Sequence, residues 1–198
     1  MRSMLVIGAG RFGKHLAMKL TELGNEVLVV DRNEDAVEKI APYVTSVQIG
    51  DCMDEEALRS LGVSNFDVCF VCISDNFQSS LEITSLLKEL GAPYVVSKTD
   101  RDIHAKFLRK IGADEVIYPE RDMAQRTAMR YSSRNAFDYY ELSPEYAIFE
   151  VLPPESWVGR SVSELEVRGK HHLNVIGIKI DDKVMPLTSA DHIFAPDE

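Results

Sequence analysis

The sequence predicts an α/β protein: a Rossmann-like, doubly wound parallel sheet with a crossover helix and a second, small α+β domain. Six short apolar runs alternate with amphipathic stretches from residue 4 to about residue 119. The runs are rich in Val and Ile and mostly continuous, as is typical of strands buried on both faces of a parallel sheet. The motif GAGRFG stands between the first run and the first amphipathic stretch, where a doubly wound fold binds phosphates.

The six predicted strands are MLVIG, EVLVVD, VTSVQIG, DVCFVCIS, APYVVSK and DEVIYP. The segments between them have helical periodicity. In the first of these segments one helical face carries Phe12, Leu16, Leu20 and Leu23. Glycine then ends this helix and two later ones, at Gly24, Gly91 and Gly112. Alternating units of this kind predict a doubly wound sheet.

The pattern changes after Pro119. The stretch ERDMAQRTAMRYSSRNAFDYYEL is compatible with a long helix and has no clean apolar stripe, so we expect this helix to pack outside its own domain. Beyond it, AIFEVLP, NVIGIKI and KVMPL are β-rich pieces separated by turn signals. We therefore predict a nucleotide-binding domain over 1–119, a crossover helix and hinge over 120–140, and a small domain over 141–198. Because the chain stops at HIFAPDE without a closing element, we expect this last domain to be incomplete.

The composition indicates which kinds of partner and which location to expect. The net charge is −10 and Lys and Arg form no dense block, so nucleic acid is not an expected partner. No apolar run approaches the roughly 20 residues of a membrane span, and no basic-then-apolar leader precedes the first strand. We expect a cytoplasmic protein.

Cys69 and Cys72 form a CxxC pair, a spacing that occurs in redox and zinc sites. Here the pair lies within an apolar strand, where residues an odd number apart point to opposite faces. No second CxxC or matching His pair follows. We expect these two cysteines to be core residues.

The residues around GAGRFG predict a nucleotide site. Gly8 permits the tight turn, Gly10 lets the backbone approach a pyrophosphate, and Gly13 lets the helix pack closely on the strand. The start of that helix would face the phosphates with its free N–H groups. Asp31, at the end of the second predicted strand, is placed to accept both ribose hydroxyls and to repel a 2′-phosphate. These residues favour NAD, ATP or ADP over NADP.

Arg11 is unusual because a cation at a helix start is disfavoured by the helix dipole. One reading is a solvated surface arginine. The other is a clamp on the phosphates of the bound nucleotide, or a clamp supplied by a neighbouring subunit.

A dehydrogenase needs a substrate domain and a proton-transferring group near the nicotinamide. Only about 60 residues follow the predicted sheet and its helix, and none of the five histidines shows a pairing that sequence can support. No serine nucleophile elbow, zincin motif or EF-hand occurs. We therefore expect a ligand-binding protein and not an enzyme.

The motifs taken together resemble a known family. In order they are GAGRFG, Asp31, VQIGD, CISDN, VVSK, GADEVIYPERDMA and FDYYELSPEYAIFEVLPPESWVGRSVSELEVRGKHHLNVIGIKI. The chain is similar to the regulator-of-potassium-conductance (RCK) proteins, the Trk/Ktr-type subunits of bacterial potassium uptake systems. The resemblance covers nearly the whole chain, and the match in the second half makes it specific.

The resemblance implies a cytosolic gating protein that binds NAD(H) or ATP/ADP without turnover. It implies dimers formed through the crossover helix, here roughly 120–136, which assemble toward an octameric ring. The ring lies under a membrane potassium channel or transporter subunit, at the inner face of the cell membrane. Nucleotide identity would change the shape of the ring and bias the pore.

The resemblance also assigns residues. The phosphate-binding set is Gly8, Gly10, Arg11 and Gly13, with Phe12 and Arg32 as further cofactor-binding candidates. Asp31 would hold the ribose, and Asp51 and Cys52 would lie by the adenine. Ser74 and Lys98 would lie toward the phosphate or nicotinamide end. Glu120 matches the position that reaches a divalent cation, Mg or Ca, near the phosphates; the alternative is ordinary stabilisation of a helix start by an acid.

Some members of the family bind cyclic di-AMP in the C-terminal domain. The matching stretch here is NVIGIKIDDKVMP. Val175, Ile176 and Pro186 are the candidates that would line such a site, and Lys179 and Lys183 would meet phosphates. The alternative is that this apolar strand is ordinary core. The chain departs from the family pattern after HIFAPDE, where the closing strand and glycine are missing.

Two other functions remain open at this point. One is a small NAD-dependent oxidoreductase completed by a partner subunit. The other is a nucleotide-dependent interaction module without a channel partner.

Overall fold

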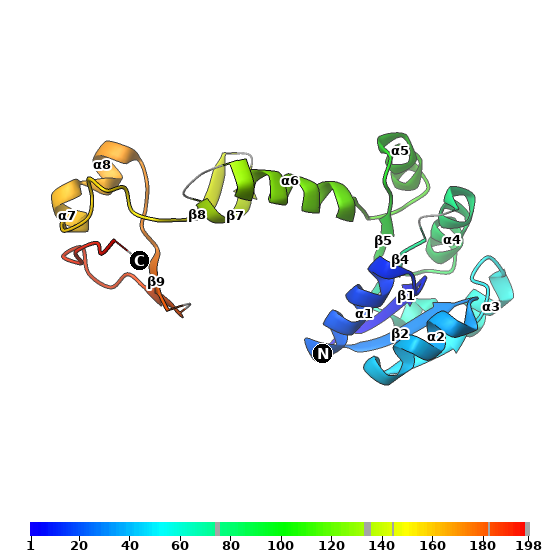
Figure 1. Ribbon diagram of the computed structural model, residues 1–198. Helices are drawn as coiled ribbons and strands as arrows, with labels where there is room; N and C mark the ends of the chain where they lie inside the picture. The colour runs from blue at the N-terminus through cyan, green and yellow to red at the C-terminus, as the bar shows by residue number, and fades with distance from the viewer. Residues whose placement is uncertain (74–75, 133–135, 144, 182, 197–198) are drawn as a thin grey trace. The chain divides into compact units, whose positions relative to one another are not determined.

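The computed structural model describes residues 1–198 apart from 74–75, 133–135, 144, 182 and 197–198, and for 136–141 it describes the backbone alone. The chain forms two compact units, Met1–Met123 and Ala124–Glu198 (Figure 1).

The first unit is built on a six-stranded parallel sheet. Its strands are β1 (Ser3–Ile7), β2 (Glu26–Asp31), β3 (Ser46–Ile49), β4 (Val68–Val71), β5 (Val95–Lys98) and β6 (Glu115–Ile117). Their order in the sheet is β3-β2-β1-β4-β5-β6, and every pairing is parallel. This is the doubly wound Rossmann order, so the predicted fold class is confirmed. The order reverses between β1 and β4, and a crevice opens there at the carboxyl ends of the strands.

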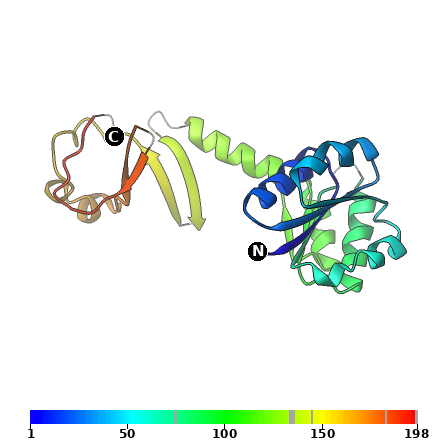
Figure 2. The same ribbon diagram turned by 90° about the horizontal axis from the view of Figure 1, so that it is seen from below.

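Helices cover both faces of this sheet (Figures 1 and 2). They are α1 (Arg11–Glu22), α2 (Glu34–Ile40), α3 (Glu55–Ser60), α4 (Phe77–Glu89) and α5 (Asp102–Lys110), with short 3-10 turns η1 (Ala41–Tyr43) and η2 (Val63–Asn65). The core has two main layers, one for each face. Leu5 of β1 packs with α3 and α4 on one face, and its neighbour Val6 packs with α1 and α2 on the other. Burial on both faces explains the continuous apolar runs of the central strands.

Two details of this unit differ from the prediction. Strand β3 is not buried on both faces, and Ile49 is 51% exposed, because β3 lies at the edge of the sheet. Leu23 does not join the buried stripe of α1: it follows the last residue of the helix and is 67% exposed. Phe12, Leu16 and Leu20 do pack against the core, as the periodicity predicts.

Cys69 and Cys72 lie in different core layers. Cys69 packs in the layer that contains Leu5, and Cys72 packs in the layer that contains Val6. Burial raises the pKa of each thiol to about 12. Both are therefore neutral core residues, as the strand geometry predicts.

Helix α6 (Pro119–Ser132) begins in the first unit and continues into the second. The sequence suggested helix through about residue 142, and this was wrong for its last part. Strand β7 (Ala136–Ser143) replaces the helix and pairs in antiparallel fashion with β8 (Tyr146–Val151). Phe137, Tyr139 and Tyr140 favour a strand once a partner strand is present, and β8 supplies that partner.

The rest of the second unit is small. It contains α7 (Val162–Leu165), α8 (Val167–His171) and an antiparallel pair, β9 (Gly177–Ile180) with β10 (Lys183–Pro186). A compact cluster of Leu165, Val167 and Phe194 forms its core. Ser161 caps α7 through a reciprocal pair of hydrogen bonds with Glu164.

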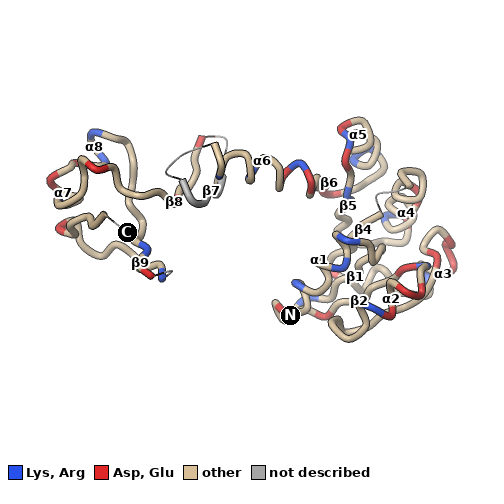
Figure 3. Tube along the Cα trace, in the orientation of Figure 1, with Lys and Arg blue, Asp and Glu red and all other residues tan. Residues whose placement is uncertain are grey.

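Charged residues are spread along the chain (Figure 3). Acidic residues mark α2 and α3, whereas Lys and Arg occur on several elements, among them α1, α5 and α8. In the part of the chain that the structure describes, no helix combines the length and the hydrophobicity needed to cross a bilayer.

Candidate nucleotide-binding site

A cavity of about 500 Å³ opens at the carboxyl ends of the strands in the first unit. The predicted residues that line it are Gly8, Gly10, Arg11, Phe12, Asp31, Arg32, Asp51, Cys52, Lys98 and Glu120. Gly13 lies behind the loop and does not line the cavity, and Ser74 falls outside the described residues. The structure therefore brings together residues from five separate segments of the chain.

The three glycines of GAGRFG have three different surroundings. Gly8 has a φ of +101°, and a Cβ there would also lie 3.3 Å from the backbone carbonyl carbon of Cys72. A Cβ on Gly13 would overlap the carbonyl oxygen of Gly8. Gly10 has no heavy atom within 4 Å of its missing Cβ, so it faces open space. Gly8 and Gly13 thus hold the loop against the helix, and Gly10 leaves room for a ligand.

The start of α1 is arranged to receive an anion. Gly10 is its N-cap, so no side chain caps the helix, and no acidic residue stands in the first turn. By contrast, α2 and α4, which start beside the same cavity, are capped by the side chains of Asn33 and Asn76. The free N–H groups and the helix dipole at the start of α1 favour a phosphate group.

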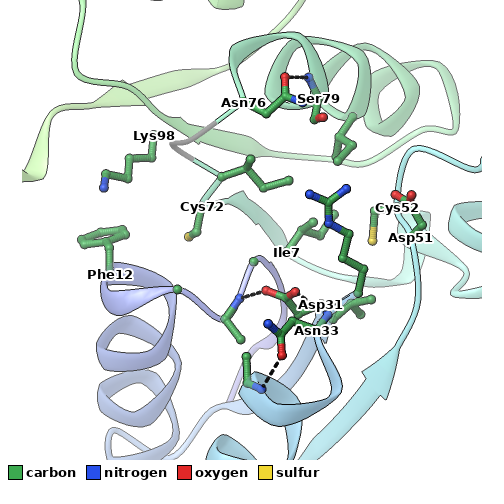
Figure 4. Close-up of a pocket in the computed structure, with 18 of the residues that line it drawn as sticks. Ile7, Phe12, Asp31, Asn33, Asp51, Cys52, Cys72, Asn76, Ser79 and Lys98 are labelled. Carbon is green, nitrogen blue, oxygen red and sulfur yellow. Dashed lines mark hydrogen bonds between the residues drawn. The ribbon is translucent and has the colours of Figure 1, made fainter.

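Asp31 connects the end of β2 to the glycine loop. One oxygen of its carboxylate accepts a 2.6 Å hydrogen bond from the N–H of Ala9, and the other accepts a 2.9 Å hydrogen bond from the N–H of Asn33 (Figure 4). A carboxylate has about four lone-pair sites, so each oxygen can still accept from a hydroxyl. The residue is half-buried and lines the cavity, which suits recognition of a ribose.

Asp51 and Cys52 lie at one end of the cavity, and Phe12 and Lys98 lie at the other (Figure 4). One carboxylate oxygen of Asp51 accepts a 3.0 Å hydrogen bond from the N–H of Met53. Burial, together with the negative charges of Asp51 and Asp31, raises the pKa of the Cys52 thiol to about 12. This thiol is therefore a neutral wall of the cavity and not a nucleophile.

Lys98 ends β5, and its side chain is only 7% exposed. Its ammonium group lies 2.7 Å from the carboxylate of Glu120, which is 66% exposed, and 5.5 Å from the centre of the Phe12 ring. The hydrogen bond from Lys98 outweighs desolvation and, with the nearby charge of Arg11, lowers the pKa of Glu120 below its ordinary value. Glu120 is the second residue of α6, so this ion pair connects the start of α6 to the carboxyl end of β5.

Sequence reasoning missed several residues of the cavity wall, among them Asn33, Met53, Asn76, Ser79 and Ile83. The asparagines carry a signal that could have identified them, because each precedes a predicted helix just beyond a strand. Met53, Ser79 and Ile83 carry no such signal. The hydroxyl of Ser79, which is 5% exposed, donates to the sulfur of Met53 at 3.1 Å.

The residues predicted for a second ligand lie in the second unit. Val175 is half-buried and packs against the core cluster of that unit, whereas Ile176 is 62% exposed. Lys179 forms an ion pair with Glu150 at 2.9 Å, and Lys183 and Pro186 are exposed on β10. Val175 therefore has the surroundings of ordinary core, and Ile176 and Pro186 remain accessible.

Among the described residues, no three His, Cys, Asp or Glu side chains are grouped as a metal site would require. Glu120 brings one carboxylate to the cavity, and that carboxylate is paired with Lys98. A divalent cation at this position would need further oxygen ligands, such as nucleotide phosphates.

The fold and this cavity define a nucleotide-binding protein of the doubly wound class. Residues 4–119 match the family model described as the TrkA-N domain, and the chain belongs to this family. Two proteins of Bacillus subtilis (strain 168) are similar over most of their length. Ktr system potassium uptake protein C is 40% identical over 184 residues, which cover 93% of this chain and 83% of that protein. Ktr system potassium uptake protein A is 40% identical over 178 residues, which cover 90% and 80%.

Solved structures agree on the fold. The GsuK channel bound to NAD aligns with a TM-score of 0.71 at 16% identity, over 100% of this chain and 36% of that chain. The Kef C-terminal domain of Shewanella denitrificans in its AMP-bound form aligns with a TM-score of 0.56 at 20% identity, over 65% and 78%. The expected resemblance to the Trk/Ktr-type proteins is confirmed by the family model and by the two Ktr proteins.

Proposed function

We propose that this chain is the nucleotide-sensing regulatory subunit of a bacterial potassium uptake system. It binds an adenine nucleotide, NAD(H) or ATP/ADP, in the cavity of the first unit and biases a membrane potassium channel or transporter subunit. One observation carries the proposal: an open phosphate cradle at Gly10 faces the Asp31 carboxylate, in a chain that is 40% identical to Ktr protein C over 93% of its length.

Each part of the cavity has a role in this function. The start of α1 holds the phosphates, assisted by Arg11, and Asp31 accepts the ribose hydroxyls. Asp51 and Cys52 lie beside the adenine, and Lys98 meets the phosphate end. The regulatory assembly has two conformations, and a nucleotide that binds one of them more tightly increases the population of that conformation. The change in population alters the opening of the pore.

Binding proceeds without turnover. Among the described residues that line the cavity there is no histidine, and both cysteine thiols have a pKa of about 12. Lys98 and Glu120, the titratable pair at the phosphate end, are bound to each other. These observations do not favour the alternative of an oxidoreductase.

The proposal extends to assembly and location, which the resemblance to the family supports. The chain forms a homodimer through the crossover helix, roughly 120–136, and builds toward an octameric ring at the inner face of the cell membrane. A divalent cation, Mg or Ca, binds between Glu120 and the nucleotide phosphates. The three functional parts are 1–119, 120–140 and 141–198. The last binds cyclic di-AMP, with Val175, Ile176 and Pro186 lining the site and Lys179 and Lys183 meeting the phosphates.

Isothermal titration calorimetry of the purified chain with ADP, ATP, NAD⁺, NADH and NADP⁺ tests the binding step. We expect saturable binding of at least one ligand that lacks a 2′-phosphate, weaker binding of NADP⁺, and no change in the absorbance of NADH over hours. Substrate-dependent oxidation of NADH at enzyme-like rates would instead support the oxidoreductase.

The partner is tested by co-expression with the membrane subunit of a Ktr or Trk system and purification through a tag on that subunit. We expect the chain to co-purify and its nucleotide to change potassium flux in reconstituted vesicles. Nucleotide binding without any co-purification would identify an interaction module of a different kind.

A further inference from the structure

The ion pair between Lys98 and Glu120 is asymmetric. The Lys98 side chain is 7% exposed and is fixed by its place at the end of β5, between β4 and β6. The Glu120 side chain is 66% exposed. A buried ammonium that loses its anion is strongly destabilised, whereas an exposed carboxylate that leaves the pair is solvated by water. Lys98 is therefore a fixed cationic site, and Glu120 is its replaceable counter-ion.

This cationic site belongs to the phosphate end of the cavity. Lys98 and Glu120 both line the cavity, together with the start of α1. The ammonium group of Lys98 lies over the ring of Phe12, which stands in the first turn of α1, two residues beyond Gly10 (Figure 4). A phosphate chain held at the start of α1 thus extends toward Lys98.

A phosphate that reaches Lys98 competes with Glu120. Both are anions, and a phosphate carries more charge and more acceptor oxygens than a carboxylate. The two anions also repel each other at short range. When no divalent cation bridges the two anions, occupation of Lys98 by phosphate therefore favours departure of Glu120 from Lys98.

Departure of Glu120 affects the start of α6. Glu120 is the second residue of this helix, and α6 is the element that continues from the first unit into the second. The neighbouring turn keeps other contacts: Arg121 stacks on the Tyr118 ring at 3.5 Å and pairs with Asp102 at 3.0 Å. The helix start is loosened when Glu120 leaves, but it remains attached.

Resting on the proposed function, we propose that Lys98 is an exchange site at which Glu120 is the resting anion and a nucleotide phosphate replaces it, so that occupancy of the cavity is converted into release of the first turn of α6. Adenosine, which lacks a phosphate, does not drive the exchange. Ligands whose phosphates reach Lys98 do.

The test is calorimetric titration of adenosine and ADP into the purified full chain, in a buffer with EDTA so that no divalent cation bridges the anions. Glu120→Gln removes the competing charge, and we expect ADP to bind roughly tenfold tighter, the difference between a charged and a neutral hydrogen-bond partner for Lys98. Asp122→Asn is the matched control, because it removes one negative charge from the same turn without contact to Lys98. We expect it to change ADP affinity by less than about twofold. Adenosine affinity should be equal in all three proteins.

Hydrogen exchange over residues 119–123 gives a second readout. Exchange in the wild-type chain should rise when ADP binds, and in Glu120→Gln it should be high before ADP is added. Lys98→Met should weaken the binding of ADP by more than about tenfold and leave the binding of adenosine unchanged. If that variant does not fold, Glu120→Gln, Asp122→Asn and the hydrogen-exchange data test the proposal.

Two results would overturn the exchange. One is Glu120→Gln binding ADP no tighter than Asp122→Asn, and the other is lower exchange over 119–123 in the ADP complex. Failure of the wild-type chain to bind adenosine, ADP, ATP or NAD(H) would instead overturn the proposed function itself.

Discussion

The carboxylate of Asp31 accepts a 2.6 Å hydrogen bond from the backbone N–H of Ala9, the residue between the first two glycines of the loop. The acid that would bind the ribose therefore also holds the loop that would bind the phosphates. This double role makes the loop and the end of β2 a single recognition unit.

Asp31→Ala should weaken all ribose-bearing ligands by a similar factor, about tenfold or more, because two charge-assisted hydrogen bonds are lost. The loop also loses its tether to β2, so the free energy of unfolding should fall by about 1–3 kcal/mol. Calorimetry with ADP and NAD⁺ and urea denaturation measure the two effects. Asp35→Ala, on the exposed start of α2, is the control. Loss of binding for one ligand alone would contradict a ribose role.

Gly13→Ala should reduce stability, whereas Gly10→Ala should reduce nucleotide affinity. A Cβ on Gly13 would meet the carbonyl oxygen of Gly8, so Gly13→Ala should lower the free energy of unfolding by at least about 2 kcal/mol. Gly10 has a φ of −63°, which alanine adopts freely, and its Cβ would point into open space. Gly10→Ala should keep its stability and lose nucleotide affinity about tenfold or more, since the methyl group occupies the phosphate cradle. Thermal unfolding with and without ADP separates the two; an unstable Gly10→Ala chain would argue against an open cradle.

Arg11→Ala should weaken nucleotides in proportion to their phosphate charge. ATP should lose more affinity than ADP, and adenosine should lose none, because the guanidinium of Arg11 at the helix start contributes only to phosphate binding. Lys14→Ala, one turn further along α1, controls for the general positive charge of this region. An equal loss for adenosine and ATP would rule out the clamp and leave a structural role.

Asp114 should make stability depend on acid pH. Its burial would raise its pKa, but hydrogen bonds from the N–H of Val95 and from Lys88 outweigh this, so its pKa lies below the ordinary value of 3.8. A carboxyl with a lowered pKa in the folded state stabilises the fold above the unfolded-state pKa, and the stabilisation is lost as the pH falls through the folded-state pKa. Asp114→Asn should therefore cost about 1–2 kcal/mol at pH 7, and the gap from wild type should narrow as the pH falls below about 4. Urea denaturation at pH 7 and pH 3 measures the gap; a gap that does not narrow would show that folding leaves the pKa of Asp114 unchanged.

The three thiols should be inert in the folded chain. Cys52, Cys69 and Cys72 are buried, each with a pKa of about 12, so almost no thiolate exists at pH 8. Iodoacetamide should label none of them within the time that labels all three in guanidinium chloride. Mass spectrometry of the labelled chain checks this, and rapid labelling of Cys52 alone would show that the cavity wall opens.

The glycine loop, Asp31 and the sheet could be predicted from sequence because they depend on local patterns. Gly8, Gly10 and Gly13 lie within six residues, and Asp31 ends the strand that follows. In a parallel sheet, adjacent strand ends meet at one edge, so these residues had to come together once the strands were recognised.

Other features depend on contacts that no local pattern encodes. The pairing of Lys98 with Glu120 spans 22 residues and is set by where α6 begins relative to β5. The sequence alone predicts helix where β7 lies, because the aromatic residues of β7 favour a strand only beside β8. Ser79 and Met53 meet only because α4 packs over the segment that precedes α3.

The close approach of Gly13 to the Gly8 carbonyl affects the rate at which a nucleotide binds. A loop packed this tightly against its helix cannot fold over a ligand, so its N–H groups are already in place before binding. Little chain entropy is lost on capture, and the encounter between protein and nucleotide sets the association rate. We therefore expect this site to fill as fast as its nucleotide arrives, so that any slower step in regulation follows binding.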